Sequence, residues 1–218
     1  MSVIPLTIKG VNRTVVQDQA DFQLEGAALL ILHADQAQLT GEADSTVSYD
    51  LRVGEKCRDH IRWTVNDIPK DGSVTLNPGS AIIIQTEEYL HLPRSMYGTI
   101  APKVSLLQQG LSTTFSKVDP GYPGNLLITL FNLGKTTVTL KRGEPFCSIT
   151  LVSVAPGARL YSKGPKQLTA PPTKQPRRSI RQWLTDHHVA IAAIGICVTI
   201  IVIIEQLIVF VWTVRHHH

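Results

Sequence analysis

Apolar and polar positions alternate in short runs along roughly the first 160 residues of the chain. The clearest runs are rich in β-branched residues and bounded by glycine, proline or asparagine: SAIIIQT (80–86), GNLLITLFN (124–132) and PFCSITLVSV (145–154). Alternation over a few residues is typical of strands with one buried face, and many short strands at regular spacing indicate an antiparallel sandwich or barrel. The pattern therefore predicts an all-β, antiparallel domain over residues 1–158.

Two predicted hairpins of this domain resemble each other. VTLNPGSAIIIQT (74–86) returns as VTLKRGEPFCSIT (138–150), with Gly79 and Gly143 at corresponding positions. A glycine after such a strand suits a turn that needs a positive φ. Two copies are too few for a solenoid, so we interpret them as equivalent hairpins of one double-layered β fold.

The composition changes after residue 158. Residues 159–184 are rich in proline, glycine and lysine, and we interpret them as an extended tail and juxtamembrane linker. Residues 189–214 read VAIAAIGICVTIIVIIEQLIVFVWTV, which is long and apolar enough to cross a bilayer. We predict a transmembrane helix over residues 185–215 and interpret residues 216–218, three histidines, as the remnant of a purification tag.

The formal net charge of +4 comes from one segment. An acid-free basic run precedes the predicted helix, and it leaves the rest of the chain mildly acidic. It consists of Arg159, Lys163, Lys166, Lys174, Arg177, Arg178 and Arg181. This distribution argues against a nucleic-acid partner and favours a cytoplasmic segment that attracts anionic lipid. Since MSVIPLTIKG offers no secretory signal, we predict a single-pass membrane protein with a C-terminal anchor and a cytoplasmic β domain.

Four residues of the C-terminal part are candidates for a role at the membrane. Trp183 and Trp212 suit the two membrane interfaces. Glu205 and Gln206 lie toward the far end of the apolar span, where an ionisable group marks function by default but also snorkels readily to the interface. If the domain is a trimer, three copies of this pair would converge as a gate; the alternative is a plain anchor.

The cysteines and histidines predict no metal site in the protein. Cys57, Cys147 and Cys197 are widely spaced and include no C-x-x-C pair, which fits buried thiols in a reducing compartment. The histidines do not fall at a familiar metal-binding spacing. We therefore expect no metal held by side chains.

Several stretches match a known group of proteins in order and spacing. They are SYDLRVGEKCR (48–58), LNPGSAIIIQTEEYLHLP (76–93), APKVSLLQQGLSTTFSKVDPGYPG (101–124) and NLGKTTVTLKRGEPFCSITL (132–151), and together they resemble the dCTP deaminase and dUTPase superfamily. The resemblance implies a jelly-roll-like β fold that assembles as a homotrimer, with nucleotide sites between subunits.

The resemblance assigns roles to two residues. In dUTPases the aspartate of a G-x-x-D-x-x-Y segment activates the attacking water and holds the 3′-hydroxyl of the deoxyribose, while the tyrosine packs on the sugar and excludes a 2′-hydroxyl. Asp119 and Tyr122 occupy these positions, so the resemblance implies sugar binding, with Asp119 catalytic only in a dUTPase. The alternative for Asp119 is a turn-forming Asp-Pro-Gly whose carboxylate caps a backbone amide.

Other positions depart from the family pattern. Thr129 stands where the deaminases have a glutamate proton shuttle, and a hydroxyl does not cycle a proton near neutral pH. The family segment R-S-S-L-A-R appears as KVSLLQ (103–108), which leaves Lys103, Ser105 and Gln108 as candidate nucleotide contacts. Lysine holds phosphate only as a point charge, and valine and glutamine bring no charge.

The tail contains one further candidate segment. YSKGPKQ (161–167) is similar to the Y-x-G-Q segment that relatives fold over a bound nucleotide, with Lys163 and Gln167 as candidate contacts. The alternative is that these lysines belong to an ordinary linker on the cytoplasmic side of the membrane.

These observations support two functions from different classes. The first is a catalytically degenerate protein that binds a nucleotide, a nucleotide-like signal or a protein partner and couples binding to the membrane, in stress or anti-phage defence. The second is a membrane-tethered dUTP diphosphatase that uses Asp119 as base, with magnesium carried by the triphosphate. A third possibility is a structural trimeric scaffold with an empty pocket.

Overall fold

The computed structural model describes residues 2–8, 13–39, 46–60, 63–169 and 188–216. The chain divides into two compact units, residues 1–171 and 172–218. The first unit holds the β domain and the start of the basic tail. The second holds the C-terminal helix.

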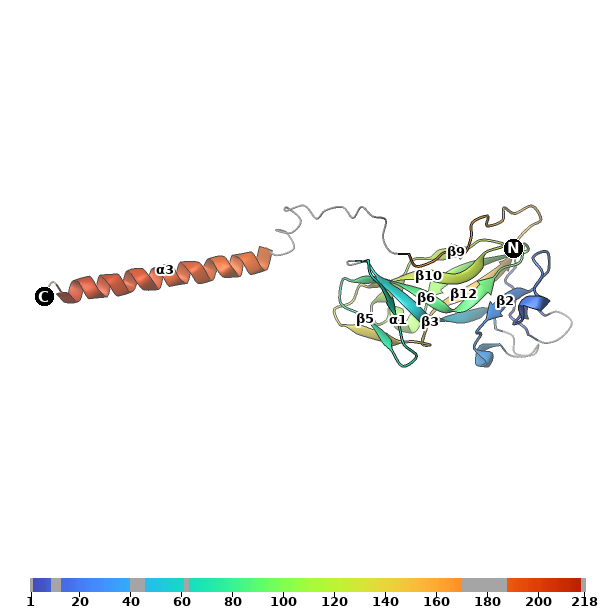
Figure 1. The fold of residues 1–218 in the computed structure, drawn as a ribbon, viewed down its shortest axis with the longest axis horizontal. Helices are drawn as coiled ribbons and strands as arrows, with labels where there is room; N and C mark the ends of the chain where they lie inside the picture. Colours follow the sequence, from blue (N-terminus) through green and yellow to red (C-terminus); the bar gives the residue numbers. More distant parts are fainter. Residues whose placement is uncertain (1, 9–12, 40–45, 61–62, 170–187, 217–218) are drawn as a thin grey trace. The chain divides into compact units, whose positions relative to one another are not determined.

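The first unit is built almost entirely of strands (Figure 1). In chain order they are β1 (Val15–Val16), β2 (Leu29–Leu32), β3 (Ser48–Asp59), β4 (Val65–Asp67), β5 (Ser73–Leu76), β6 (Ala81–His91), β7 (Met96–Pro102), β8 (Leu111–Thr113), β9 (Ser116–Val118), β10 (Pro123–Asn132), β11 (Val138–Lys141) and β12 (Pro145–Ser153). Short helical turns lie at Gln19–Asp21 (η1), Gln36–Gln38 (η2) and Val104–Leu107 (α1). The predicted all-β class is confirmed.

Ten strands of the described part form one sheet, in which β6 pairs with β2, β3 and β10, and β12 pairs with β3 and β7. These pairings are antiparallel, whereas β1 and β2 run parallel. The predicted antiparallel arrangement is thus confirmed for the central strands.

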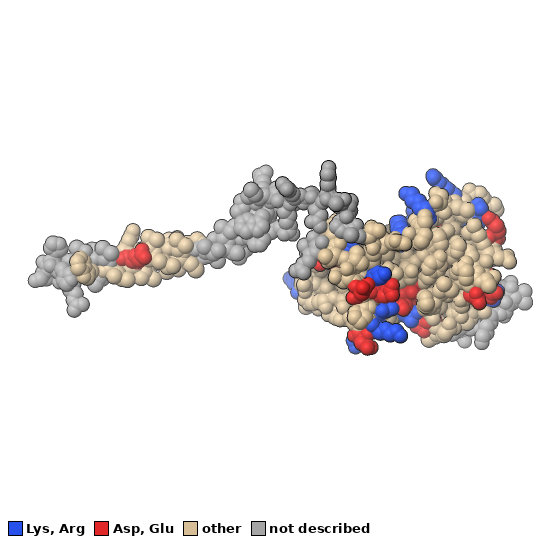
Figure 2. All heavy atoms as spheres, in the orientation of Figure 1, with Lys and Arg blue, Asp and Glu red and all other residues tan. Residues whose placement is uncertain are grey.

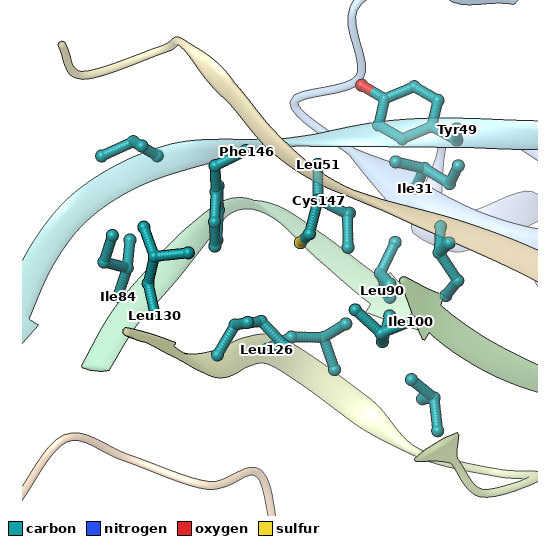
Figure 3. Packing of buried hydrophobic residues seen from close by; sticks show 14 of the residues in the cluster. Ile31, Tyr49, Leu51, Ile84, Leu90, Ile100, Leu126, Leu130, Phe146 and Cys147 are labelled. Atoms are coloured by element: carbon teal, nitrogen blue, oxygen red, sulfur yellow. The ribbon is translucent and has the colours of Figure 1, made fainter. Parts of the chain in front are cut away.

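The core forms because alternate residues of β6 and β10 face inward. β6 buries every second residue along its whole length, and β10 does the same. Figure 3 shows the result: side chains from β6 and β10 point toward Leu51 of β3 and toward Phe146 and Cys147 of β12. Burying a side chain of leucine or isoleucine size contributes about 1.5–3 kcal/mol, so this shared interior is the main source of the domain's stability.

The two similar strand–turn–strand segments of the sequence occupy equivalent positions in the fold. β5 leads into β6 and β11 into β12, and the turn glycines Gly79 and Gly143 have φ angles of 72° and 80°. β5 and β11 also pair with each other as a separate two-stranded sheet, with Val138 opposite Leu76. The turn glycines are therefore confirmed, but the prediction of hairpins is wrong. Each segment passes from the two-stranded sheet into the ten-stranded sheet, so β5 pairs with β11 and neither strand pairs with the one that follows it in the chain.

Acidic and basic side chains are interspersed on the face of the β domain drawn in Figure 2. Several form ion pairs, including Arg142 with Glu87 at 3.3 Å and Lys56 with Glu55 at 3.6 Å. Mixed charges of this kind do not form the one-sign field that attracts a polyanion.

The second unit contains helix α3 (His188–His216). Its described side chains are exposed, among them Ile196, Ile204, Glu205 and Trp212. Within the described residues, no helix meets the length and hydropathy needed to span a membrane. Trp183 and most of the predicted linker lie outside the described residues.

Candidate functional site

The corner between β9 and β10 is formed by Asp119, Pro120, Gly121 and Tyr122. The backbone N–H of Tyr122 donates to the carbonyl of Asp119 at 3.1 Å, and Gly121 has a φ of 76°. Proline fixes one backbone angle of this turn and glycine supplies the positive φ that follows. The local sequence thus sets the separation between the Asp119 carboxylate and the Tyr122 ring.

Asp119 and Tyr122 line one cavity of about 130 Å³. The tail contributes Tyr161 and Lys166 to its wall, and β9 contributes Lys117. The remaining lining residues are mostly apolar: Ile100, Ser116, Val118, Leu126, Leu127 and Ile128. The cavity therefore offers a carboxylate and an aromatic ring on an otherwise apolar wall, the kind of surface that orients a small polar ligand.

The carboxylate of Asp119 is partly exposed and forms an ion pair with Lys117, with 3.0 Å between Oδ1 and Nζ. A hydrogen bond and the charge of Asp119 raise the pKa of the Lys117 ammonium. Because the lysine is exposed, solvent screens the pair and its contribution to stability is small. The pair leaves the carboxylate at the cavity wall, where it can meet a ligand.

Tyr122 is held from three sides. Its hydroxyl donates to the carbonyl of Asn125 at 2.8 Å, and its ring meets the edge of Tyr161 with 5.0 Å between centroids. The backbone of Lys166 also lies close enough to the hydroxyl to lower its pKa, against the larger effect of burial. Burial raises the pKa of Tyr122 to about 12, so the phenol stays protonated at neutral pH.

The tail passes over this region in the same chain. The backbone N–H of Tyr161 donates to the carbonyl of Pro120 at 2.8 Å, and Pro165 packs so closely on Gly124 that a Cβ there would come within 2.8 Å of it. Farther along, Arg58 donates to the carbonyl of Thr169 at 2.9 Å. The segment 160–169 is therefore docked at both of its ends.

A second hollow lies on the other side of this segment. It measures about 390 Å³ and is lined by Lys56, Gln85, Tyr89, Gly124, Asn125, Pro165, Lys166, Gln167 and Leu168. Lys166 lines both hollows, and Gln167 lines only this one. Lys163 is exposed and belongs to neither lining.

The other predicted phosphate contacts lie on helix α1. Lys103 precedes the helix and forms an ion pair with Asp50 of β3, whose other carboxylate oxygen accepts from the Ser148 hydroxyl at 2.5 Å. Ser105 and Gln108 are exposed. Lys103 is thus engaged within the domain, in contrast to a lysine that projects freely toward a phosphate.

Helix α1 and the corner lie at opposite ends of β7. Val118 pairs with Gly98 near the start of β7, whereas Lys103 directly follows the strand's last residue, Pro102. At a rise of about 3.3 Å per residue, Asp119 and Lys103 are roughly 20 Å apart along the strand. Within one chain the fold does not bring the two groups of predicted residues together.

The remaining predicted site residues lie elsewhere. Thr129 of β10 pairs with Ile83 of β6, is partly exposed and lines neither hollow. Glu205, Gln206 and Trp212 are exposed on α3.

The structure also reveals functional candidates that the sequence reasoning missed. Lys117 lines the cavity. The sequence could have indicated this, because residues two apart in an extended segment face the same side and Lys117 lies two residues before Asp119. Glu88 is fully buried and accepts hydrogen bonds from Arg52 and Tyr49. The sequence carried a signal for this burial, because Glu88 lies two residues before Leu90 and so shares the inward face of the strand. Among the described residues, no three His, Cys, Asp or Glu side chains gather as metal ligands.

Comparison with known proteins places the β domain in a family. Residues 23–154 match the sequence profile of the dCTP deaminase-like family. The dCTP deaminase of Thermococcus kodakarensis is 33% identical over 123 residues, which cover 56% of this chain and 78% of the relative. That of Pyrococcus furiosus is 32% identical over 123 residues, again 56% and 78%.

Solved structures give a weaker likeness. The dCTP deaminase of Agrobacterium tumefaciens superposes with a TM-score of 0.44 at 22% identity, covering 54% of this chain and 41% of that one, which is too low to support an inference. The sequence profile and the archaeal relatives carry the assignment: this chain belongs to the dCTP deaminase-like family.

Proposed function

We propose that this protein binds a deoxynucleotide through Asp119 and Tyr122 and does not catalyse deamination. The observation that carries the proposal is the shared cavity: both residues line it together with Tyr161 and Lys166 of the tail. The position that would have to move a proton is Thr129, which lies outside that lining and whose hydroxyl is a poor acid and base near neutral pH.

In this proposal, the residues of the same chain bind the phosphate groups of the deoxynucleotide only weakly. Lys103 is paired with Asp50, and Gln108 brings no charge. The family's shared sites also require a neighbouring subunit, which we propose in the form of a homotrimer. The separation of roughly 20 Å between Asp119 and Lys103 along β7 supports it, because a second subunit would supply the α1 that its own chain keeps too far away.

We further propose that the C-terminal helix anchors the protein to a membrane as a single-pass segment, with the β domain on the cytoplasmic side. Two observations support this: the sequence 189–214 is apolar, and the described apolar side chains of α3 are exposed. Transfer of such side chains from water into lipid is favourable. A nucleotide hydrolase gains little from an anchor, whereas a sensor with a membrane effector depends on one. Stress or anti-phage defence is the role that suits such a sensor.

The second candidate is a dUTP diphosphatase with Asp119 as base. The observation in its favour is that the carboxylate reaches the cavity wall and remains partly exposed, so water has access to it. Magnesium would be carried by the triphosphate. The third candidate, a structural scaffold, predicts that no nucleotide changes the melting temperature.

Two measurements on the full chain separate these functions. Mass spectrometry after denaturation identifies a nucleotide that copurifies, and thermal shift with dUTP and dCTP measures binding; a ligand at 100 times its Kd stabilises by about 2.7 kcal/mol. A pyrophosphate-release assay then tests turnover. We expect stabilisation without turnover, reduced in Asp119→Asn and unchanged in Asp21→Asn, whose carboxylate is paired at the surface with Arg13. Turnover that disappears in Asp119→Asn establishes the hydrolase, and no thermal shift with either nucleotide rejects binding.

A further inference from the structure

The pairing of β6 and β10 is irregular beside the cavity. Asn125 lies opposite Tyr89, but Leu127, only two residues on, lies opposite Gln85. The segment 86–88 of β6 therefore bulges away from the ladder. A bulge leaves backbone groups without their usual partners, and these groups need others if the bulge is to have one shape.

Two side chains supply these partners. Thr86 is 1% exposed; its hydroxyl donates to the Glu88 carbonyl at 2.9 Å and accepts from the N–H of Leu126 at 2.9 Å. The amide of Asn125 donates to the carbonyls of Thr86 and Glu88 at 2.9 and 3.0 Å, with a longer contact of 3.4 Å to Glu87. Thr86 and Asn125, which we call the bulge latch, thus connect β6 and β10 where the regular backbone pairing of these strands is interrupted.

The bulge latch is bonded directly to the candidate sugar-binding ring. The Tyr122 hydroxyl donates to the backbone carbonyl of Asn125, the residue whose side chain is fastened to β6. Between Tyr122 and Asn125, Gly124 has a φ of 141°, a backbone conformation that residues with a side chain rarely adopt. Asn125 therefore provides one of the contacts that position the Tyr122 hydroxyl, and this contact is only as firm as the attachment of Asn125 to β6.

We propose that Thr86 and Asn125 are positioning residues that fix Tyr122 against the cavity and so determine how strongly the protein discriminates 2′-deoxyribose from ribose. Neither residue lines that cavity, so their effect passes through Tyr122. The inference rests on the proposed deoxynucleotide binding. A ring that excludes a hydroxyl must resist displacement by about the size of one atom, and misplacement by ~1 Å is enough to cost a site much of its selectivity.

The test compares four variants of the full-length protein with the wild type. Thr86→Val keeps the shape of the side chain and removes the hydroxyl, whereas Thr86→Ser keeps the hydroxyl. Asn125→Ala removes the amide. Asn132→Ala is the matched control, because Asn132 ends the same strand and its buried amide donates to the carbonyls of Leu76 and Thr136. Each variant is titrated with dUTP and with UTP, and hydrogen–deuterium exchange of residues 119–126 is measured without ligand.

We expect Thr86→Val and Asn125→Ala to lower the preference for dUTP over UTP by about tenfold or more, and to accelerate exchange at residues 119–126. Thr86→Ser should restore the preference, and Asn132→Ala should leave it unchanged even though it destabilises the domain. An unchanged preference in both latch variants would overturn the inference and leave nucleotide binding intact. If the wild type binds neither nucleotide, the proposed function fails. Hydrogen–deuterium exchange tests the bulge latch independently of binding: if residues 119–126 stay protected in both latch variants, the latch does not hold this segment and the inference fails as well.

Discussion

The rings of Tyr122 and Tyr161 meet edge to face, with centroids 5.0 Å apart and planes inclined by 63°. Tyr122 belongs to the corner before β10, and Tyr161 belongs to the tail beyond the last strand. The pair fastens the tail beside the cavity that Asp119 lines. The docked tail therefore completes the wall of this cavity.

Removing the Tyr161 ring should release the tail. Aromatic pairs contribute about 0.5–1.5 kcal/mol beyond the area they bury, so we expect Tyr161→Ala to raise proteolytic cleavage within residues 160–169 severalfold. Tyr161→Phe is the control, since it keeps the ring and loses only the hydrogen bond to the Gly164 carbonyl. Equal cleavage of the alanine variant and the wild type would show that other contacts hold the tail.

The buried carboxylate of Glu88 should be far more important for stability than that of its partly exposed neighbour, Glu87. Glu88 is 0% exposed and accepts from the backbone and side chain of Arg52 and from the Tyr49 hydroxyl. Losing it leaves buried donors without an acceptor, so Glu88→Ala should lower the free energy of unfolding by about 3 kcal/mol. Glu87→Ala, which breaks the partly exposed pair with Arg142, should cost about 1 kcal/mol. Urea denaturation measures both, and equal losses would contradict this difference.

A double-mutant cycle tests whether Lys103 is engaged with Asp50. The two side chains are 27% and 29% exposed, so the coupling should be about 1 kcal/mol. Lys103→Met, Asp50→Asn and the double variant are compared by urea denaturation. Zero coupling would mean that Lys103 is free in solution, and would favour its use as a phosphate ligand.

Stability should fall on acidification because of His91. Burial lowers the pKa of His91, which stacks on Phe22 with 4.1 Å between centroids. The unfolded chain takes up a proton at pH values below about 6.5, where the folded protein resists it. The contribution is therefore complete above pH 6.5 and is lost as the pH falls toward the folded value. We expect His91→Phe to lose less stability between pH 7.5 and 5.0 than wild type, as urea denaturation at each pH measures. Equal losses in the two proteins would contradict this role of His91.

Thiol labelling should distinguish the three cysteines and test the membrane proposal. Cys57 and Cys147 are buried, and burial raises the pKa of both thiols, whereas Cys197 is exposed on α3. Because the thiolate is the reactive form and both buried thiols hold their protons, a water-soluble maleimide should label Cys197 alone once α3 is free of lipid and detergent. In native membranes we expect Cys197 to be protected until the bilayer is dissolved. Rapid labelling of Cys197 in intact membranes would argue against insertion of α3.

The alternation in SAIIIQT and GNLLITLFN was enough to predict β6 and β10, because a half-buried strand leaves a two-residue period in its own sequence. The turn glycines of the two similar segments were also predictable, since a positive φ is a local requirement, whereas the pairing of β5 with β11 in place of two hairpins was not. The resemblance also assigned the corner at Asp119 and Tyr122 to a sugar site, and that assignment stays a prediction. The predictable properties are those that neighbouring residues determine among themselves.

Pairings between distant segments were decided by the tertiary structure alone. No local pattern joins Tyr161 to Tyr122, Lys103 to Asp50, or the amide of Asn125 to the carbonyls of Thr86 and Glu88. These contacts form because the β fold stacks strands that are far apart in the chain, and each buried polar group then takes the partner that lies within reach. The sequence therefore determined which residues face the site, and the packing of the strands determined what holds them there.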